Sequence, residues 1–309
     1  MDEQLTPDYL STIWNAITGT ANWTWNLITL DSSIPWYQNY FYALIVISLA
    51  IWLLELAFPW RKEQKAFRKD FWLDGFYMFF NFFVFSIAIS GFYAAIGLFL
   101  GGIGMSMQSL ALFDISTLPT GVALLVFFII NDFVQWFTHV QLHRYEFLWQ
   151  FHKVHHSVEE MGFAAHLRYH WMENLFYKPL KTLAVMIVGG FEPQHAFLIH
   201  FLSIIIGHLN HANIRITWGP FKYIFNNSVM HLYHHAKHLP EDRKNGVNFA
   251  ISLSIWDYIF GKNYIPQDQD GSYDLGFDDM DEFPKGFGGQ LVYGFTKKST
   301  EKTSEVLDN

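Results

Sequence analysis

The sequence predicts an all-α protein: a polytopic integral membrane helical bundle of about four membrane spans or hairpins, with a cytoplasmic, histidine-rich helical cap. Of its 309 residues 51% are hydrophobic, and they include 32 Phe, 15 Tyr and 12 Trp. Several apolar runs reach the roughly 20 residues that a helix needs to cross a bilayer. All 15 histidines lie between residues 139 and 238, after the third of these runs.

The first 39 residues place Trp14, Trp23 and Trp25 among small polar residues. Tryptophan favours the boundary between lipid and water, where its ring is buried and its N–H remains solvated. We expect an N-terminal interfacial segment over residues 1–39, lying at the membrane surface.

The membrane-embedded domain is expected over residues 40–265. Three apolar runs of spanning length lie in it, at 40–60, 72–100 and 119–137. A fourth apolar stretch, 176–207, is interrupted at 189–194 by the sequence GGFEPQ. Glycine and proline favour turns, so this stretch is predicted to be a hairpin of two half-spans or one bent segment.

Basic residues alternate along the chain with these spans. Five follow the first span within residues 61–69, none lies in the loop 101–118, and several follow the third span, beginning with Arg144. Because basic loops stay in the cytoplasm, the pattern predicts a non-cytoplasmic N-terminus and a cytoplasmic histidine cluster.

The histidines form three compact motifs. They are H139-VQL-H143, H152-KV-HH156 and H231-LY-HH235. Side chains three or four residues apart share one face of a helix, and imidazole is a strong ligand for iron, copper, zinc and nickel. Two copies of H-x-x-H-H offer more imidazoles than one tetrahedral ion uses, so the motifs predict a centre with two metal ions.

Further histidines are candidates to complete the two coordination shells. His208 and His211 form an i, i+3 pair at the end of the fourth apolar stretch, and His170 forms an i, i+4 pair with His166. The metal-ligand candidates are therefore His139, His143, His152, His155, His156, His170, His208, His211, His231, His234 and His235.

The first two motifs cannot share a centre on one straight helix. His152 follows His139 by thirteen residues, which is about 220° around an ideal helix. We therefore predict a break in the helix between Arg144 and Trp149.

Carboxylates close to the motifs are candidates to orient the ligating rings. Asp132, Glu173 and Asp257 can accept hydrogen bonds from the outer nitrogens of ligating histidines and so fix their tautomers. Asp132 lies at the end of an apolar span, where an unpaired charge is costly.

Residues 266–309 are rich in aspartate and glycine and are predicted to form an acidic cytoplasmic tail, most of it solvated. The net charge of −8 is mild and does not indicate a nucleic-acid partner. The chain contains no cysteine, which excludes disulfides, thiolate haem and cysteine-ligated iron–sulfur clusters. Any metal must bind to nitrogen and oxygen.

Taken in order, the motifs resemble those of the fatty acid hydroxylase and sterol desaturase superfamily. The matching segments are DFVQWFTHVQLHRY at 132–145, LWQFHKVHHS at 148–157, RYH at 168–170, HAN at 211–213, MHLYHH at 230–235 and SIWDYIFG at 254–261. Glu173, Asn248 and Asp257 also match recurrent positions of that superfamily.

The resemblance implies an oxygen-dependent, non-haem di-iron enzyme of the membrane. Such an enzyme uses two Fe ions and O2 to hydroxylate or desaturate a C–H bond in a membrane lipid. Electrons must come from a separate cytoplasmic donor protein, because the chain shows no nicotinamide or flavin fingerprint. Fatty acyl lipids, sterol-like terpenoids, carotenoids and alkyl ethers all remain candidate substrates.

Other classes of protein also use buried histidines. A histidine-lined membrane metal transporter predicts ligands distributed along the spans, whereas these motifs cluster at the span ends. A bis-histidine haem protein would leave the adjacent pairs at 155–156 and 234–235 without a role. A zinc hydrolase of the H-E-x-x-H type is disfavoured because that motif is absent from the sequence.

Overall fold

The computed structural model describes residues 8–105, 111–190 and 193–296, and these residues form helices joined by loops. Within the described ranges the only β pairing is an isolated bridge between Ala236 and Leu275. The predicted all-α class is confirmed.

Three helical segments are long and apolar enough to cross a membrane. They are α2 (Tyr40–Ala57), the continuous helix Phe71–Gly102, and α5 (Thr120–Arg144). The middle segment consists of α3 (Phe71–Phe79), a π-helical turn (Phe80–Val84) and α4 (Phe85–Gly102). These segments agree with the three apolar runs in the sequence and mark the chain as a membrane protein.

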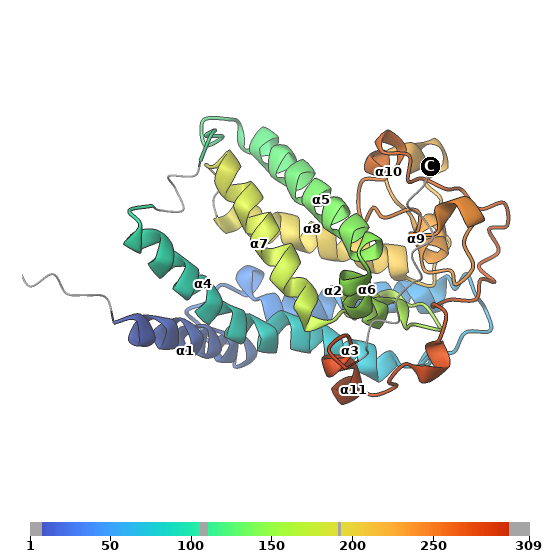
Figure 1. Cartoon of the computed structure of the whole chain (residues 1–309), viewed down its shortest axis with the longest axis horizontal. Helices are drawn as coiled ribbons and strands as arrows, with labels where there is room; N and C mark the ends of the chain where they lie inside the picture. The colour runs from blue at the N-terminus through green and yellow to red at the C-terminus, as the bar shows by residue number, and fades with distance from the viewer. Residues whose placement is uncertain (1–7, 106–110, 191–192, 297–309) are drawn as a thin grey trace, which may run out of the picture.

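The fourth apolar stretch forms two helices, α7 (Trp171–Val188) and α8 (Pro193–His211). Figure 1 shows α7 and α8 beside α5, running in opposite directions. The predicted break at 189–194 is confirmed, since Gly189 and Gly190 both have positive φ angles of 68° and 74°. The two helices have 18 and 19 residues, and neither is among the three described segments that are long and apolar enough to cross a membrane.

Helix α1 (Tyr9–Ile28) packs along α4 (Figure 1). The close approach needs Gly91, because a Cβ there would lie 2.8 Å from the side chain of Ile17. Ser90 Oγ also donates to the carbonyl of Ala16 at 3.1 Å. A short 3-10 turn (Trp36–Gln38) leads into α2. The interfacial position of this N-terminal segment remains a prediction.

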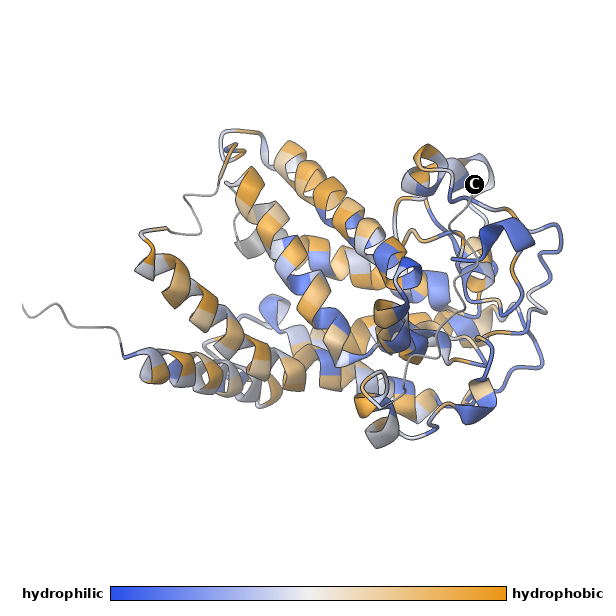
Figure 2. Ribbon diagram, viewed as in Figure 1, coloured by the Kyte–Doolittle hydropathy of each residue, from blue (hydrophilic) through white to orange (hydrophobic). Residues whose placement is uncertain are grey.

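The cap lies at one end of the bundle. Its helices are α6 (Glu146–His156), α9 (Ser228–His234), α10 (Ile255–Ile259) and α11 (Phe287–Val292). Its 3-10 turns lie at Phe163–Leu167, Gly219–Tyr223, Glu241–Arg243 and Met280–Glu282. Figure 2 shows hydrophilic residues gathered in the cap and hydrophobic residues along the bundle.

The predicted break between the first two histidine motifs is confirmed. Helix α5 ends at Arg144 and α6 begins at Glu146, with Tyr145 extended at φ −98° and ψ 121°. The turn lets α6 fold back so that the two motifs face a common centre.

The expectation of a solvated tail after residue 265 is wrong for residues 277–293. Phe277, Phe283 and Tyr293 are buried with Tyr77 of α3 and Val154 of α6. Gln290 is buried as well, and its Oε1 accepts a hydrogen bond from the Tyr77 hydroxyl at 3.0 Å. Aromatic residues between the acidic positions supply the apolar surface that anchors this segment, while residues 297–309 lie outside the described part of the chain.

Candidate metal centre

The structure gathers nine buried or half-buried histidines into two groups. In each group, one ring nitrogen from every member lies within 4.8 Å of those of the others. The first histidine group is His139, His143, His152, His156 and His234. The second histidine group is His155, His211, His231 and His235.

The two H-x-x-H-H motifs divide their side chains between these groups in a reciprocal way. Helix α6 sends His152 and His156 to the first group and His155 to the second. Helix α9 and its C-cap send His231 and His235 to the second group and His234 to the first. Residues four apart share a helix face, whereas the histidine between them lies about 60° from one and about 100° from the other, on the side toward the other group.

Backbone carbonyls fix the rings of four of these histidines. The Nδ1 of His139, His155, His211 and His234 lies 2.7–3.0 Å from the oxygens of Phe249, Arg168, Gly207 and Val247 respectively. A carbonyl only accepts hydrogen bonds, so each Nδ1 must carry the proton. In the neutral ring, each Nε2 is then an unprotonated lone pair.

These rings are held in the neutral form that ligates metals. Burial lowers the pKa of His155 to about 4 and that of His234 to about 3. Burial and the neighbouring rings also lower the pKa values of His152, His156, His231 and His235 well below the ordinary histidine value. The groups therefore offer neutral donors at pH 7.

Several ring nitrogens of the two groups face one another or lie without a hydrogen-bond partner. The Nε2 atoms of His155 and His211 are 3.4 Å apart, although neither has a proton to share. Within the described residues, His234 Nε2 and the Nδ1 atoms of His231 and His235 are buried without a hydrogen-bond partner. The Nε2 atoms of His155, His211 and His234 are buried lone pairs, which are costly unless a cation lies beside them, so the donor set fits a pair of metal ions.

Glu173 is the carboxylate that touches a ring of these groups. Its Oε2 lies 3.0 Å from His152 Nδ1, and its Oε1 accepts from the backbone N–H of His170 at 3.2 Å. The first contact is the carboxylate–histidine pairing that orients metal ligands.

Asp132 and Asp257 act through the backbone of the loop 247–253 rather than on a ring. Asp257 accepts hydrogen bonds from the N–H groups of Phe249 and Ala250 and from Trp136 Nε1. Asp132 accepts from the N–H groups of Ser252 and Leu253 and from Trp256 Nε1. The loop they hold presents the carbonyls of Val247 and Phe249 to His234 and His139.

Asn248 stabilises the same loop from its other side. It has a positive φ of 54°, a conformation that asparagine tolerates well. Its Oδ1 accepts from the backbone N–H of Tyr264, and its Nδ2 donates to the carbonyls of Met230 and Tyr264. Asn248 therefore ties α9 to the loop 247–253, and its side chain touches no histidine ring.

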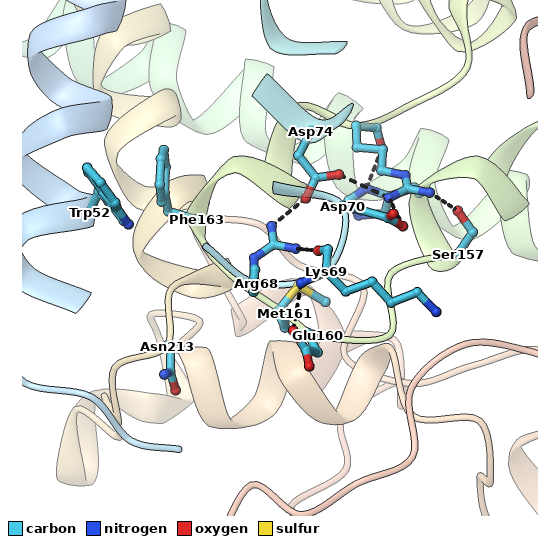
Figure 3. Close-up of polar contacts among 12 residues, drawn as sticks. Trp52, Arg68, Lys69, Asp70, Asp74, Ser157, Glu160, Met161, Phe163 and Asn213 are labelled. Atoms are coloured by element: carbon cyan, nitrogen blue, oxygen red, sulfur yellow. Dashed lines mark hydrogen bonds and ion pairs between the residues drawn. The ribbon is translucent and has the colours of Figure 1, made fainter. Parts of the chain in front are cut away.

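A buried ionic network, not expected from the sequence, lies behind His155. Arg168, whose carbonyl orients His155, donates to Asp70, Asp74 and Ser157 Oγ. Asp74 also pairs with Arg68, and Figure 3 shows Asp70 and Asp74 close together beside Arg68. The network joins the start of α3 to the loop 157–168.

Glu55 is a second buried feature that was not among the candidates named from the sequence. It is buried near the end of α2, and its Oε1 accepts from the backbone N–H groups of Phe163 and Asn213, at 2.8 and 2.7 Å. Its signal in the sequence was a single carboxylate within an apolar span, which is rare without a function or a partner.

Two of the predicted ligands lie outside both histidine groups. His170 has Nε2 bonded to the carbonyl of Leu291 and Nδ1 to the N–H of Met172. His208 contacts Ser48 Oγ with Nε2 and His166 Nδ1 with its own Nδ1. Both ring nitrogens of His170 and of His208 thus contact partners that belong to neither histidine group.

A cavity of about 260 Å³ opens beside the two histidine groups. His139, His152 and His155 form one wall of it, and side chains of α5, α7 and α8 form the others. Members of both histidine groups therefore line one cavity, His139 and His152 of the first and His155 of the second.

Residues 124–262 match the model of a family described as fatty acid hydroxylase. The chain is 30% identical over 185 residues to the ornithine lipid hydroxylase OlsE of Rhizobium tropici, covering 60% of this chain and 54% of that protein. It is 30% identical over 133 residues to an alkylglycerol monooxygenase of Caenorhabditis elegans, covering 42% and 25% of the two chains.

A plant methylsterol monooxygenase, 1-1 of Arabidopsis thaliana, is 28% identical over 145 residues, which cover 45% of each chain. The matched region thus spans about half the length, or less, of these curated relatives. No solved structure matches the chain.

Proposed function

Because the chain carries a fatty acid hydroxylase domain of the fatty acid hydroxylase and sterol desaturase superfamily, we propose that it is a membrane lipid monooxygenase or desaturase with a histidine-ligated di-iron centre. The observation that carries the proposal is the pair of histidine groups with their inward, unprotonated nitrogens. Related proteins named for the hydroxylation of an ornithine lipid and for alkylglycerol and methylsterol oxidation support a lipid substrate.

Iron is the metal proposed because the donors are imidazoles and the relatives are named as oxygenases. The ligands would be the nine members of the two groups, with Glu173, Asp132, Asp257 and Asn248 supporting them from outside. When bound, two iron ions supply the redox chemistry that activates O2.

The protein's own part is to position the substrate and to limit water. In hydroxylation one oxygen atom of O2 enters the C–H bond and the other leaves as water, which requires two electrons and two protons. A lipid bound in the cavity would bring one of its C–H bonds toward His139, His152 and His155, which line it. The surrounding apolar helices keep bulk water from the reacting carbon.

The electrons must come from outside the chain. It contains no cysteine for an iron–sulfur cluster and no recognisable flavin or nicotinamide motif. We therefore propose a separate cytoplasmic donor protein that docks on the cap. The alternation of basic loops supports a cytoplasmic position for the cap and its metal centre.

The alternative of a metal transporter is less well supported. A transport path needs ligands along the depth of the membrane, whereas the nine histidines lie together where the bundle meets the cap.

The experiment that tests the proposal is a metal analysis with Mössbauer spectroscopy on protein expressed with iron and purified in detergent. Two coupled irons per chain that react with O2 after reduction are expected. Protein that carries no iron under these conditions, or only isolated iron that does not react with O2, would refute the proposal. A lipid oxidation assay with a chemical reductant would then identify hydroxylated or desaturated products.

A further inference from the structure

Two lysines project from α7 into the cavity beside the histidines. Lys178 and Lys181 are one helical turn apart, so they share a face of α7, and both line the cavity of about 260 Å³. They also line a second cavity of about 370 Å³ whose other walls include Tyr40, Phe82 and Phe127. The two ammonium groups therefore lie where the two cavities meet.

Neither lysine forms a salt bridge with a carboxylate among the described residues, although the charge of Asp132 acts on Lys181 from a longer distance. Lys181 Nζ donates to Gln135 Oε1 at 2.7 Å, and Lys178 Nζ donates to Ser86 Oγ at 3.3 Å. No salt bridge in the described part of the chain includes either residue. Each ammonium has three donors and uses one of them in these contacts.

The carboxylates closest to this region are committed elsewhere. Asp132 accepts three hydrogen bonds from Ser252, Leu253 and Trp256, and Glu173 accepts from His152 and the backbone of His170. A charged amine among apolar helices is costly, and such residues commonly face a substrate path or a partner charge. Two of them on one face of a cavity form a site for an anion.

Resting on the proposed function, we propose that the substrate is an anionic lipid, whose carboxylate or phosphate oxygens bind between Lys178 and Lys181. Lysine serves such a group as a point charge, and charge-assisted hydrogen bonds are stronger than neutral ones. The apolar part of the lipid occupies the second cavity, between Tyr40, Phe82 and Phe127. The part of the lipid next to its anionic group lies in the first cavity, beside the histidines, where polar side chains such as Gln135 and Asn174 also line the wall.

The test measures binding, independently of turnover. Detergent-purified protein is titrated with tritiated oleate, oleoyl lysophosphatidate and neutral monoolein in a scintillation proximity assay. We expect saturable binding of at least one anionic lipid, about tenfold tighter than that of monoolein. Comparison of oleate with lysophosphatidate distinguishes a carboxylate site from a phosphate site.

The variants Lys178→Met and Lys181→Met keep the apolar stem and remove the charge. Each is expected to weaken binding of the preferred anionic lipid by about tenfold and to leave monoolein unchanged. Lys181→Arg should retain binding, because it retains the charge. Lys237→Met, at an exposed position of the cap, is the matched control and should bind as the wild type does.

Equal binding of monoolein and both anionic lipids by the wild-type protein would overturn the proposal. So would unchanged anionic-lipid binding in both methionine variants. Iron content is measured on the same samples, so the two proposals can fail separately. Iron-loaded protein without anionic preference refutes only the lysine site, and iron-free protein that still selects anionic lipids refutes only the di-iron proposal.

Discussion

At the scale of single residues, the direction of each imidazole is set by the group behind it. Carbonyls of Phe249, Arg168, Gly207 and Val247 each take an Nδ1–H, which leaves Nε2 to point inward. The sequence shows which histidines cluster, because their spacing is visible. It does not show the carbonyls, because every residue type carries a backbone carbonyl and only the fold decides which one faces a ring.

We predict that His155→Ala and His234→Ala each reduce iron from about two ions to one or fewer per chain. His155 belongs to the second histidine group and His234 to the first, so the two variants test the groups separately. Metal content is measured by mass spectrometry of the purified proteins. His238→Ala is the control, since His238 is exposed and belongs to neither group. Full iron loading in His155→Ala or His234→Ala would remove that residue from the proposed ligands.

A second prediction concerns Asp257. Burial raises the pKa of its carboxyl to about 6, although hydrogen bonds from Trp136, Ala250 and Phe249 oppose the shift. In Asp257→Asn the amide NH2 group faces N–H donors, which leaves buried donors unpaired at a cost of about 1–3 kcal/mol. We expect a lower melting temperature and a 10–100-fold weaker metal affinity, because the loop carrying the carbonyls of Val247 and Phe249 loosens.

Thermal unfolding and competition with a chelator measure these two effects. Asp278→Asn is the control, because the Asp278 side chain is 90% exposed. If Asp257→Asn keeps the metal affinity of the wild type, Asp257 has no part in positioning His139 and His234.

At the scale of elements, the helix boundaries follow from local signals. The break at Tyr145 was predictable from the angle between the first two histidine motifs on an ideal helix. The turn at Gly189 and Gly190 was predictable because glycine favours turns. The π-helical turn at Phe80–Val84 was not, since its sequence, FNFFV, is as apolar as the rest of the span. The turn contains Asn81 and places it against the loop that leads from the second motif to α7. There its Nδ2 donates to the carbonyls of Leu167 and Tyr169.

The packing of α8 against the 3-10 turn Phe163–Leu167 gives a prediction at this scale. A Cβ at Gly207 would lie 2.2 Å from ring atoms of His166, whose ring is 5.2 Å from that of His211. Gly→Ala within a helix normally stabilises it by up to about 1 kcal/mol. We expect Gly207→Ala to destabilise the protein instead and to lower its metal content, since the His166 ring, which packs beside His211, must move.

Gly97→Ala, in α4, is the matched control. A Cβ there meets no atom within 4 Å, so this variant should be neutral or more stable. Melting temperature and metal content are compared for the two variants. An increase in stability for Gly207→Ala equal to that of Gly97→Ala would contradict the predicted contact.

At the scale of the whole molecule, hydropathy predicts the bundle but not all of the cap. The apolar spans and the position of the cap after them were readable from the sequence. The return of residues 277–293 onto α3 and α6 was not, because its acidic composition resembles that of a solvated tail. Its anchors are scattered aromatic residues, and their partners, Tyr77 and Val154, are more than a hundred residues away.

The orientation of the bundle in the membrane remains a prediction, and the absence of cysteine makes it simple to test. Ser116 and Ser272 are exposed, the first in the loop before α5 and the second in the cap. We expect a single cysteine at Ser116 to react with an impermeant maleimide from outside intact cells. A single cysteine at Ser272 should react only after the membrane is opened. Labelling of both positions from the same side would contradict the proposed topology.

The reciprocal division of the H-x-x-H-H motifs has a consequence for how the protein takes up its ions. Helices α6 and α9 each contribute to both histidine groups, so we expect that an ion bound in one group also holds the helices that complete the other. Binding of the first ion carries the entropic cost of fixing those helices. The second ion then binds with a smaller entropic cost and therefore more tightly. Titration of the metal-free protein should therefore be cooperative, with chains that hold either two ions or none and few that hold one.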